Sequence, residues 1–223
     1  MVIKQNKQQK RWKGKMSRMK QVKLLDIADI IMGQSPKSIF YNLNGNGLPF
    51  FQGRSEFGET YPNVKKWCTK ILKVAKKNDV LMTVRAPVGD LNIAKEECII
   101  GRGLCALRSK LNNGRFLYYL LKGNNNYITS FGSGAVYDAV KKDSVDNLIF
   151  EIPEELTQQK IAAILSAYDD LIENNTRRIQ ILEEMAQRIY KEWFVDFRFP
   201  GHEKVKFIDS ELGKIPEGWE VKI

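Results

Sequence analysis

The chain has 223 residues, of which 43% are hydrophobic, and a formal net charge of +10. This length and composition are typical of one large folded domain, or of a domain with an appendage, and not of a disordered chain. No run of about eighteen apolar residues is present, and the basic N-terminus is followed by no apolar core. The sequence therefore predicts neither a membrane span nor a secretory signal, and we expect a cytoplasmic protein.

The positive charge is concentrated at the N-terminus. Residues 1–23 carry nine Lys or Arg and no acid, a charge of +9, whereas residues 24–150 carry +6 and residues 151–223 carry −5. We interpret residues 1–20 as a disordered basic arm, which adds nonspecific attraction at most. Without the arm, a basic region precedes an acidic one, a polarity that suits phosphate contact by the first and protein contact by the second.

Short strands and a helix are expected between residues 21 and 153. Glycine, proline, serine and asparagine are frequent over residues 33–58, which is typical of turns between short strands. Apolar runs predict strands at 79–84, 91–94, 104–107 and 147–152, and a helix at 115–121 that ends at Gly123 and the asparagines after it. This globular region should therefore be an α+β domain.

A long helix is predicted over residues 154–199, with Thr157 as its N-cap, an end near Phe197, and Pro200-Gly201 after it. Along it, steps of four and three define a stripe that is apolar at nine of its ten positions: Ile161, Leu165, Tyr168, Ile172, Asn175, Ile179, Leu182, Ala186, Ile189 and Trp193. These steps place the whole stripe on one face of a helix, with the repeat of a coiled coil. At about 1.5 Å per residue the stripe is roughly 48 Å long, so we expect it to pair with another helix. Asn175 would fix the register or orientation of that pair.

Aromatic side chains gather at the end of this helix, where a packed core and a docking surface are both possible interpretations. They are Tyr190, Trp193, Phe194, Phe197 and Phe199. Large aromatics dominate both interfaces and cores, and we favour docking on a partner because these residues cap a projecting helix. Residues 200–223 form a C-terminal extension whose last residues, Val221-Lys222-Ile223, repeat Val22-Lys23-Leu24 after 199 residues, as if a second copy began there.

Several short blocks occur in a characteristic order along residues 22–223. They are Gly33-Gln34-Ser35-Pro36, Gly47-Leu48-Pro49-Phe50, residues 78–89 (NDVLMTVRAPVG), Gly101-Arg102-Gly103, Gly132-Ser133-Gly134, residues 152–161 (IPEELTQQKI), Leu165-Ser166-Ala167-Tyr168-Asp169 and Trp193-Phe194-Val195-Asp196-Phe197. In this order the blocks resemble the specificity subunit of type I restriction-modification systems, the component that reads DNA sequence for a methyltransferase and an endonuclease.

The resemblance implies a target-recognition domain followed by a long conserved helix, normally present twice in one chain. In that family the two helices pair antiparallel, hold two DNA-reading heads apart and bind two adenine-N6 methyltransferase subunits. This chain has one head and one helix, so a self-pairing half-size subunit, a truncated product and one member of a split pair remain open. We favour a homodimer, because an exposed apolar helix would otherwise aggregate.

The same resemblance implies a noncatalytic chain that binds no cofactor. S-adenosylmethionine, ATP and magnesium would be used by partner subunits, among them the restriction subunits with translocase and endonuclease activity. Its partners would be double-stranded DNA and these subunits, with no membrane. A coiled-coil adaptor whose head binds protein in place of DNA is the alternative, and a nuclease is a third possibility.

DNA reading requires Arg or Lys side chains toward guanine, Asn or Gln toward adenine, and basic side chains toward phosphate. The candidates in probable head loops are Gln52, Arg54, Lys65, Lys66, Asn112, Arg115, Lys141 and Lys142. Arg85 and Arg102 lie in the shared blocks, and we interpret them as parts of the scaffold.

Catalytic chemistry finds less support in the sequence. Residues 131–134 (FGSG) imitate a loop that binds S-adenosylmethionine, but no Pro-Pro motif of an adenine methylase is present, and we interpret them as a structural turn. Asp79, Asp90, Glu96 and Glu97 lie near Lys95 as in a nuclease, yet such charges usually cover a solvated face. The three cysteines form no C-x-x-C pair and His202 is the only histidine, so we expect reduced thiols and no metal site.

Overall fold

The computed structural model describes residues 19–111, 113–133, 140–211 and 213–220, and it divides the chain into two compact units, residues 1–166 and 167–223. Most of the expected basic arm lies outside the described residues, and Lys20 already belongs to a strand. No helix in the described part of the chain is long and apolar enough to cross a membrane. The expected class, a mixed α+β region followed by a long helix, is confirmed.

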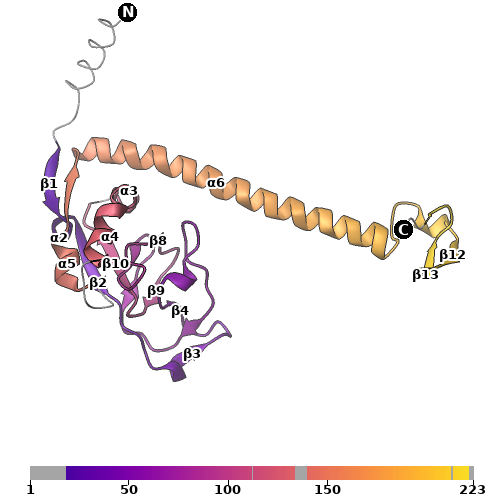
Figure 1. Cartoon of the computed structure of the whole chain (residues 1–223), viewed down its shortest axis with the longest axis horizontal. Coiled ribbons are helices and arrows are strands. Elements are labelled where there is room, and N and C mark those ends of the chain that lie inside the picture. Colours follow the sequence, from indigo (N-terminus) through magenta and orange to yellow (C-terminus); the bar gives the residue numbers. More distant parts are fainter. Residues whose placement is uncertain (1–18, 112, 134–139, 212, 221–223) are drawn as a thin grey trace, which may run out of the picture. The chain divides into compact units, whose positions relative to one another are not determined.

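A four-stranded antiparallel sheet forms the centre of the first unit (Figure 1). Its order is β2 (Ala28–Met32), β10 (Leu104–Ser109), β7 (Val80–Thr83) and β8 (Leu91–Ile93), so three predicted strands are confirmed. All four residues of β7 are buried, because the sheet is covered on both faces. Val80 and Met82 contribute to one hydrophobic cluster and Leu81 to another, as the two-residue period of a strand requires.

A second, five-stranded sheet lies in the same unit. Its order is β3 (Tyr41–Asn42), β5 (Trp67–Cys68), β4 (Leu48–Phe51), β9 (Cys98–Ile100) and β6 (Val74–Ala75), with only β4 and β9 parallel. A 3-10 turn, Ser38–Phe40, precedes β3. The glycine blocks connect the two sheets: Gly33 donates its N–H to the Leu104 carbonyl at 2.9 Å, and a Cβ on Gly33 would lie 2.1 Å from the Gly101 oxygen. Only glycine allows this close approach.

Helices cover one face of the central sheet. They are α2 (Leu24–Ile27), α3 (Gly114–Gly123), α4 (Asn125–Ser133) and α5 (Lys142–Asp146). The predicted helix at 115–121 is confirmed as α3, and the Asn113 side chain caps it by accepting the Phe116 N–H at 3.1 Å. The expected turn at 131–134 is wrong for its described part, because residues 131–133 continue α4.

The predicted last strand, β11 (Ile149–Ile152), leads into the long helix and pairs antiparallel with β1 (Lys20–Lys23). The helix α6 runs over Glu155–Tyr190 and continues into a π-helical turn, Lys191–Val195 (Figure 1). Thr157 is not its N-cap, because the helix begins two residues earlier and the Thr157 N–H donates to the Glu154 carbonyl at 3.0 Å. The end comes within two residues of the predicted Phe197, whose φ of +54° is outside the helical range.

The second unit contains a 3-10 turn, His202–Lys204, and a hairpin of β12 (Phe207–Ser210) and β13 (Gly213–Pro216). The ring of Trp219 lies 5.5 to 5.6 Å from those of Phe194, Phe197 and Phe199. These aromatics therefore contact Trp219 within their own unit, Phe194 remains 48% exposed, and docking on a partner stays a prediction. The two compact units do not correspond to the four predicted segments, and the predicted domain boundaries stay a prediction.

Candidate nucleic-acid interface

Four of the predicted DNA-contacting residues lie on one loop, residues 52–66, between β4 and β5. The loop starts with a 3-10 turn, Arg54–Glu56, and folds back on itself. The Glu56 carboxylate accepts the N–H groups of Gln52 and Gly53 at 3.2 and 3.0 Å, and the Lys65 ammonium donates to the Ser55 carbonyl at 2.9 Å. Arg54, Lys65 and the neighbouring Lys66 are exposed on it. The loop therefore presents three cations from a defined backbone.

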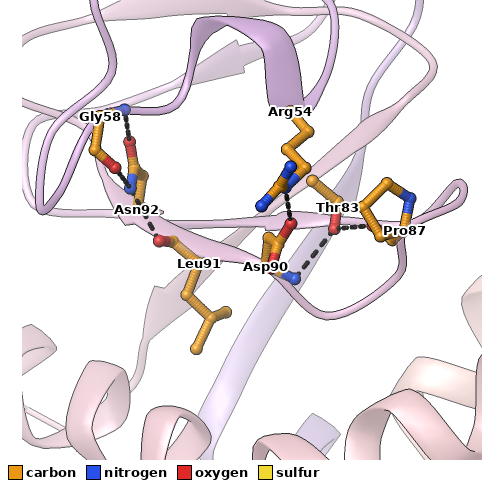
Figure 2. A network of polar contacts seen from close by, with 7 residues as sticks. All are labelled: Arg54, Gly58, Thr83, Pro87, Asp90, Leu91 and Asn92. Carbon is orange, nitrogen blue, oxygen red and sulfur yellow. Dashed lines mark hydrogen bonds and ion pairs between the residues drawn. The ribbon is translucent and has the colours of Figure 1, made fainter.

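A buried asparagine on strand β8 fastens this loop to the central sheet. The Asn92 side-chain oxygen accepts the Gly58 N–H and its amide donates to the Gly58 carbonyl, both at 3.1 Å (Figure 2). The Ile93 N–H donates to the Thr60 carbonyl at 2.8 Å, two residues further along the loop. Because Asn92 is almost fully buried, its side-chain amide cannot bond to water, and the two hydrogen bonds to Gly58 supply the partners that it needs. Asn92 thus holds the loop in place as a backbone strand would.

Arg54 is oriented by Asp90, which lies in the turn between β7 and β8. Its Nε forms an ion pair with the Asp90 carboxylate, which is two-thirds buried, while the Arg54 side chain is 63% exposed. The Asp90 N–H donates to the buried Thr83 hydroxyl at 3.0 Å, and that hydroxyl donates to the Pro87 carbonyl at 2.7 Å (Figure 2). A polar hollow of about 270 Å³ lies beside this pair, between Phe57 and Asn92.

The side-chain oxygen of Gln52 bonds to another part of the protein and is not free to contact DNA. This oxygen accepts the Ser35 hydroxyl at 3.0 Å, and the same hydroxyl oxygen accepts the Arg102 N–H at 3.1 Å. A Cβ on Gly101 would lie 2.7 Å from the Gln52 oxygen. Gln52 thereby connects the loop to two of the shared sequence blocks, and a DNA contact by its amide nitrogen stays a prediction.

Arg115 lies against the loop and not on it. It sits in the first turn of α3, where its Nη2 donates to the Tyr61 hydroxyl at 2.7 Å, with the guanidinium 5.8 Å from the ring centroid. The Lys95 ammonium lies 5.6 Å from the same ring. Arg115 is half-buried and packs the loop onto the helix, so its expected DNA contact also stays a prediction.

The remaining candidates lie elsewhere or outside the described residues. Lys141 and Lys142 are exposed at the start of α5, next to Val140, whose N–H donates to the Val84 carbonyl at 2.7 Å. Lys142 forms an ion pair with Asp146 at 2.6 Å, one turn along the helix. Asn112 lies outside the part of the chain that the structure describes.

The acidic cluster considered for nuclease chemistry does not form one site. Asp79 is buried and accepts two hydrogen bonds from Arg108, at 3.1 and 2.8 Å, which raise the pKa of that guanidinium. The expectation of a solvated face is therefore wrong for Asp79, and Asp90 is paired with Arg54. Within the described ranges no group of three or more His, Cys, Asp or Glu residues could hold a metal ion. The three cysteines are free and buried, and burial raises the pKa of Cys98 and of Cys105 to about 12.

The stripe on α6 is exposed along nearly its whole length. Of its ten residues only Ile161 is half-buried, because it packs against the core of the first unit, next to buried Ala162. An apolar groove of about 530 Å³ opens at this end of the helix, lined by Ile161 and Leu165 together with Phe116, Tyr119 and Leu120. The next positions of the stripe toward the C-terminus, Tyr168 and Ile172, are exposed.

Residues 16–184 match the family model described as the type I restriction modification DNA specificity domain. The chain belongs to this family. The chain is 42% identical, over 163 residues, to the "Putative type I restriction enzyme MjaX specificity subunit" of Methanocaldococcus jannaschii. The aligned residues cover 72% of this chain and 38% of that relative. The type I restriction enzyme MjaIX specificity subunit of the same organism is 31% identical over 215 residues, or 90% of this chain and 49% of its own.

Among solved structures, the HsdS subunit from Thermoanaerobacter tengcongensis superposes with a TM-score of 0.60 at 36% identity. The match covers 79% of this chain and 44% of that one. The chain thus spans about half the length, or less, of the relatives it matches. The sequence-based assignment to the specificity-subunit family is confirmed.

Proposed function

We propose that this chain is the sequence-reading, noncatalytic component of a type I restriction-modification system and acts in the cytoplasm. The match of residues 16–184 to the DNA specificity domain carries this proposal. In it, adenine-N6 methylation and restriction are performed by partner subunits, which use S-adenosylmethionine, ATP and magnesium. The first unit of this chain supplies the DNA contact.

The loop at residues 52–66 has the chemistry that such a contact needs. Lys65 and Lys66 are exposed cations suited to phosphates, and Arg54 presents a planar guanidinium suited to a base edge. The loop is fixed to the sheet through Asn92, so it reaches DNA with little ordering left to do. Lys141 and Lys142 would add phosphate contacts from α5.

Self-pairing through α6 is the second part of the proposal. In an antiparallel pair centred on the stripe, Ile161 of one copy faces Trp193 of the other, because both lie sixteen residues from the middle at position 177. Trp193 would then enter the apolar groove beside Ile161 and Leu165. The arrangement covers exposed apolar side chains on both copies and gives the closed two-fold symmetry that most homodimers have.

The flanks of the stripe supply a further surface for partner subunits. One flank carries Ile164, Leu171 and Met185, each more than half exposed, together with Arg178; the other carries Asp169, Thr176, Glu183 and Tyr190. An antiparallel pair with two-fold symmetry brings the same flank of both helices to the same side. The side with the first flank is then apolar beyond the pairing seam except at Arg178, and we assign it to the adenine methyltransferase subunits.

Two identical heads on an antiparallel pair read inverted half-sites, so the proposed target is bipartite. The spacing follows from the length of the helix, roughly 48 Å over the stripe at about 1.5 Å per residue. A labelled duplex carrying the target should bind the chain with its methyltransferase more tightly than other sequences, and the affinity should fall steeply with salt. Equal affinity for all sequences contradicts the proposal, and a head with no duplex affinity at low salt favours the adaptor alternative.

Light scattering tests the pairing separately. A dimer mass at micromolar concentration is expected, and a monomer mass contradicts self-pairing. The Leu171→Glu variant should stay dimeric but lose copurification with the methyltransferase, because it places a charge on the apolar flank. Asp169→Ala, on the opposite flank, is the matched control and should keep both properties.

A further inference from the structure

Arg54 is held at one edge of its guanidinium and open at the other. The ion pair to Asp90 uses Nε, and Arg54 makes no other side-chain hydrogen bond among the described residues. The two terminal nitrogens are left with parallel N–H groups, a pair of donors in fixed geometry. Guanine presents a matching pair of acceptors, O6 and N7, in the major groove.

Asp90 is itself fixed from behind. Its backbone N–H donates to the Thr83 hydroxyl at 3.0 Å and its carbonyl accepts the Thr83 N–H at 2.9 Å. Thr83 is almost fully buried, and its hydroxyl is further oriented by the Pro87 carbonyl at 2.7 Å (Figure 2). The carboxylate therefore has a rigid support at the β7–β8 turn, and it limits the directions that the long Arg54 side chain can take.

The charge of Asp90 decides between two kinds of DNA contact. A carboxylate beside the guanidinium repels a phosphate and offsets much of the attraction that Arg54 would offer it. A base edge carries no net charge, so the same carboxylate costs little there and improves the aim of the donors. Lys65 and Lys66 lie on the same loop, with no acid bound to either ammonium among the described residues, and they suit phosphate.

Resting on the proposed function, we propose that Arg54 reads a guanine of the target and that Asp90, supported by Thr83, is the positioning residue for this readout. The DNA-recognition loop is then more than a basic patch. The loop at residues 52–66 contains a sequence-determining donor pair, and an acidic residue at the β7–β8 turn aims that pair. Asp90 would contact no nucleotide.

The test uses duplexes selected from a random library by the full chain with its methyltransferase. Each guanine of the selected target is replaced in turn by 7-deazaguanine, which lacks the N7 acceptor. Wild type should lose at least about fivefold in affinity at one guanine. Arg54→Ala and Asp90→Asn should both bind the unmodified target at least about fivefold more weakly and show no further loss at that guanine. A merely structural role would leave the 7-deazaguanine effect intact.

Lys65→Ala is the matched control on the same loop. It should weaken all duplexes alike, lower the salt dependence by about one phosphate contact, and keep the sensitivity to 7-deazaguanine. Asp90→Asn keeps the backbone hydrogen bonds to Thr83, and Arg54→Ala, at an exposed position, carries the test if Asp90→Asn fails to fold. A folded Arg54 or Asp90 variant that keeps the sequence selectivity and the 7-deazaguanine sensitivity of the wild type overturns the inference. Wild-type protein that selects no sequence overturns the proposed function itself.

Discussion

The buried ion pair between Asp79 and Arg108 makes a sharp prediction about stability. Asp79 accepts two hydrogen bonds from Arg108 and also the Lys76 N–H at 2.8 Å, from a nearly fully buried position. Removing one partner of a buried pair costs about 3–5 kcal/mol, because the other charge is left without compensation. Since the Arg108 side chain is 33% exposed and regains some hydration, we expect Asp79→Ala to lower the free energy of unfolding by about 2–3 kcal/mol.

A matched control lies on the other side of the same arginine. Asp29 is the cross-strand neighbour of Arg108 in β2, but it is 62% exposed and its ion pair is with Lys110, at 3.4 Å. Asp29→Ala should therefore cost less than about 0.5 kcal/mol. Urea unfolding followed by circular dichroism measures both, at one fixed protein concentration because self-association adds stability. Equal losses in the two variants, or a loss below about 1 kcal/mol for Asp79→Ala, would refute the reasoning.

Three further predictions concern the thiols, the glycine junction and the helix pair. The thiols of Cys98 and Cys105 have a pKa of about 12 in the folded state and about 9 in the unfolded state. Between these pH values the unfolded state has lost the protons that the folded state still holds. The free energy of unfolding should therefore fall by about 1.4 kcal/mol per pH unit for each thiol. Urea titrations from pH 9 to 11 should show a slope shallower by that amount in Cys105→Ala, and an unchanged slope contradicts the assignment. Gly33→Ala should lower the unfolding free energy by at least about 1 kcal/mol, because its Cβ would lie 2.1 Å from a backbone oxygen. Gly123→Ala, which meets nothing within 4 Å at the end of α3, should be neutral or stabilising, and similar effects of the two variants would contradict this account. Asn175→Leu should raise the thermal midpoint of the dimer while loosening its register, which disulfide crosslinking between engineered cysteines detects; a lowered midpoint would show that Asn175 does not lie in the seam.

The sequence predicted those elements whose burial leaves a periodic trace. The strand β7 is an apolar run because both sheet faces are covered, and α6 shows its seven-residue repeat because one face needs a partner. Two-residue strands such as β3, β5 and β6 leave no such trace, since each contributes a single residue to either face. The helix α4 was not predicted from the sequence, because it begins with asparagines, which are weak helix formers.

For the candidate interface, residue type pointed to Arg54, Lys65 and Lys66, but not to what orients them. Asp90 lies 36 residues from Arg54 in the sequence, and Asn92 lies 34 residues from Gly58. Such pairs form only when β8 folds beside the loop, so no local pattern reveals them. One signal was available: Asn92 is a polar residue at an inward position of an apolar strand, which suggests a buried hydrogen-bonding role.

We propose that this chain determines which DNA sequence is bound. The most direct measurement is selection of duplexes from a random library by the chain with its methyltransferase, followed by sequencing. We predict enrichment of one bipartite motif with inverted half-sites, lost when this chain is omitted. Enrichment of no motif, or of the same motif without this chain, would contradict the claim.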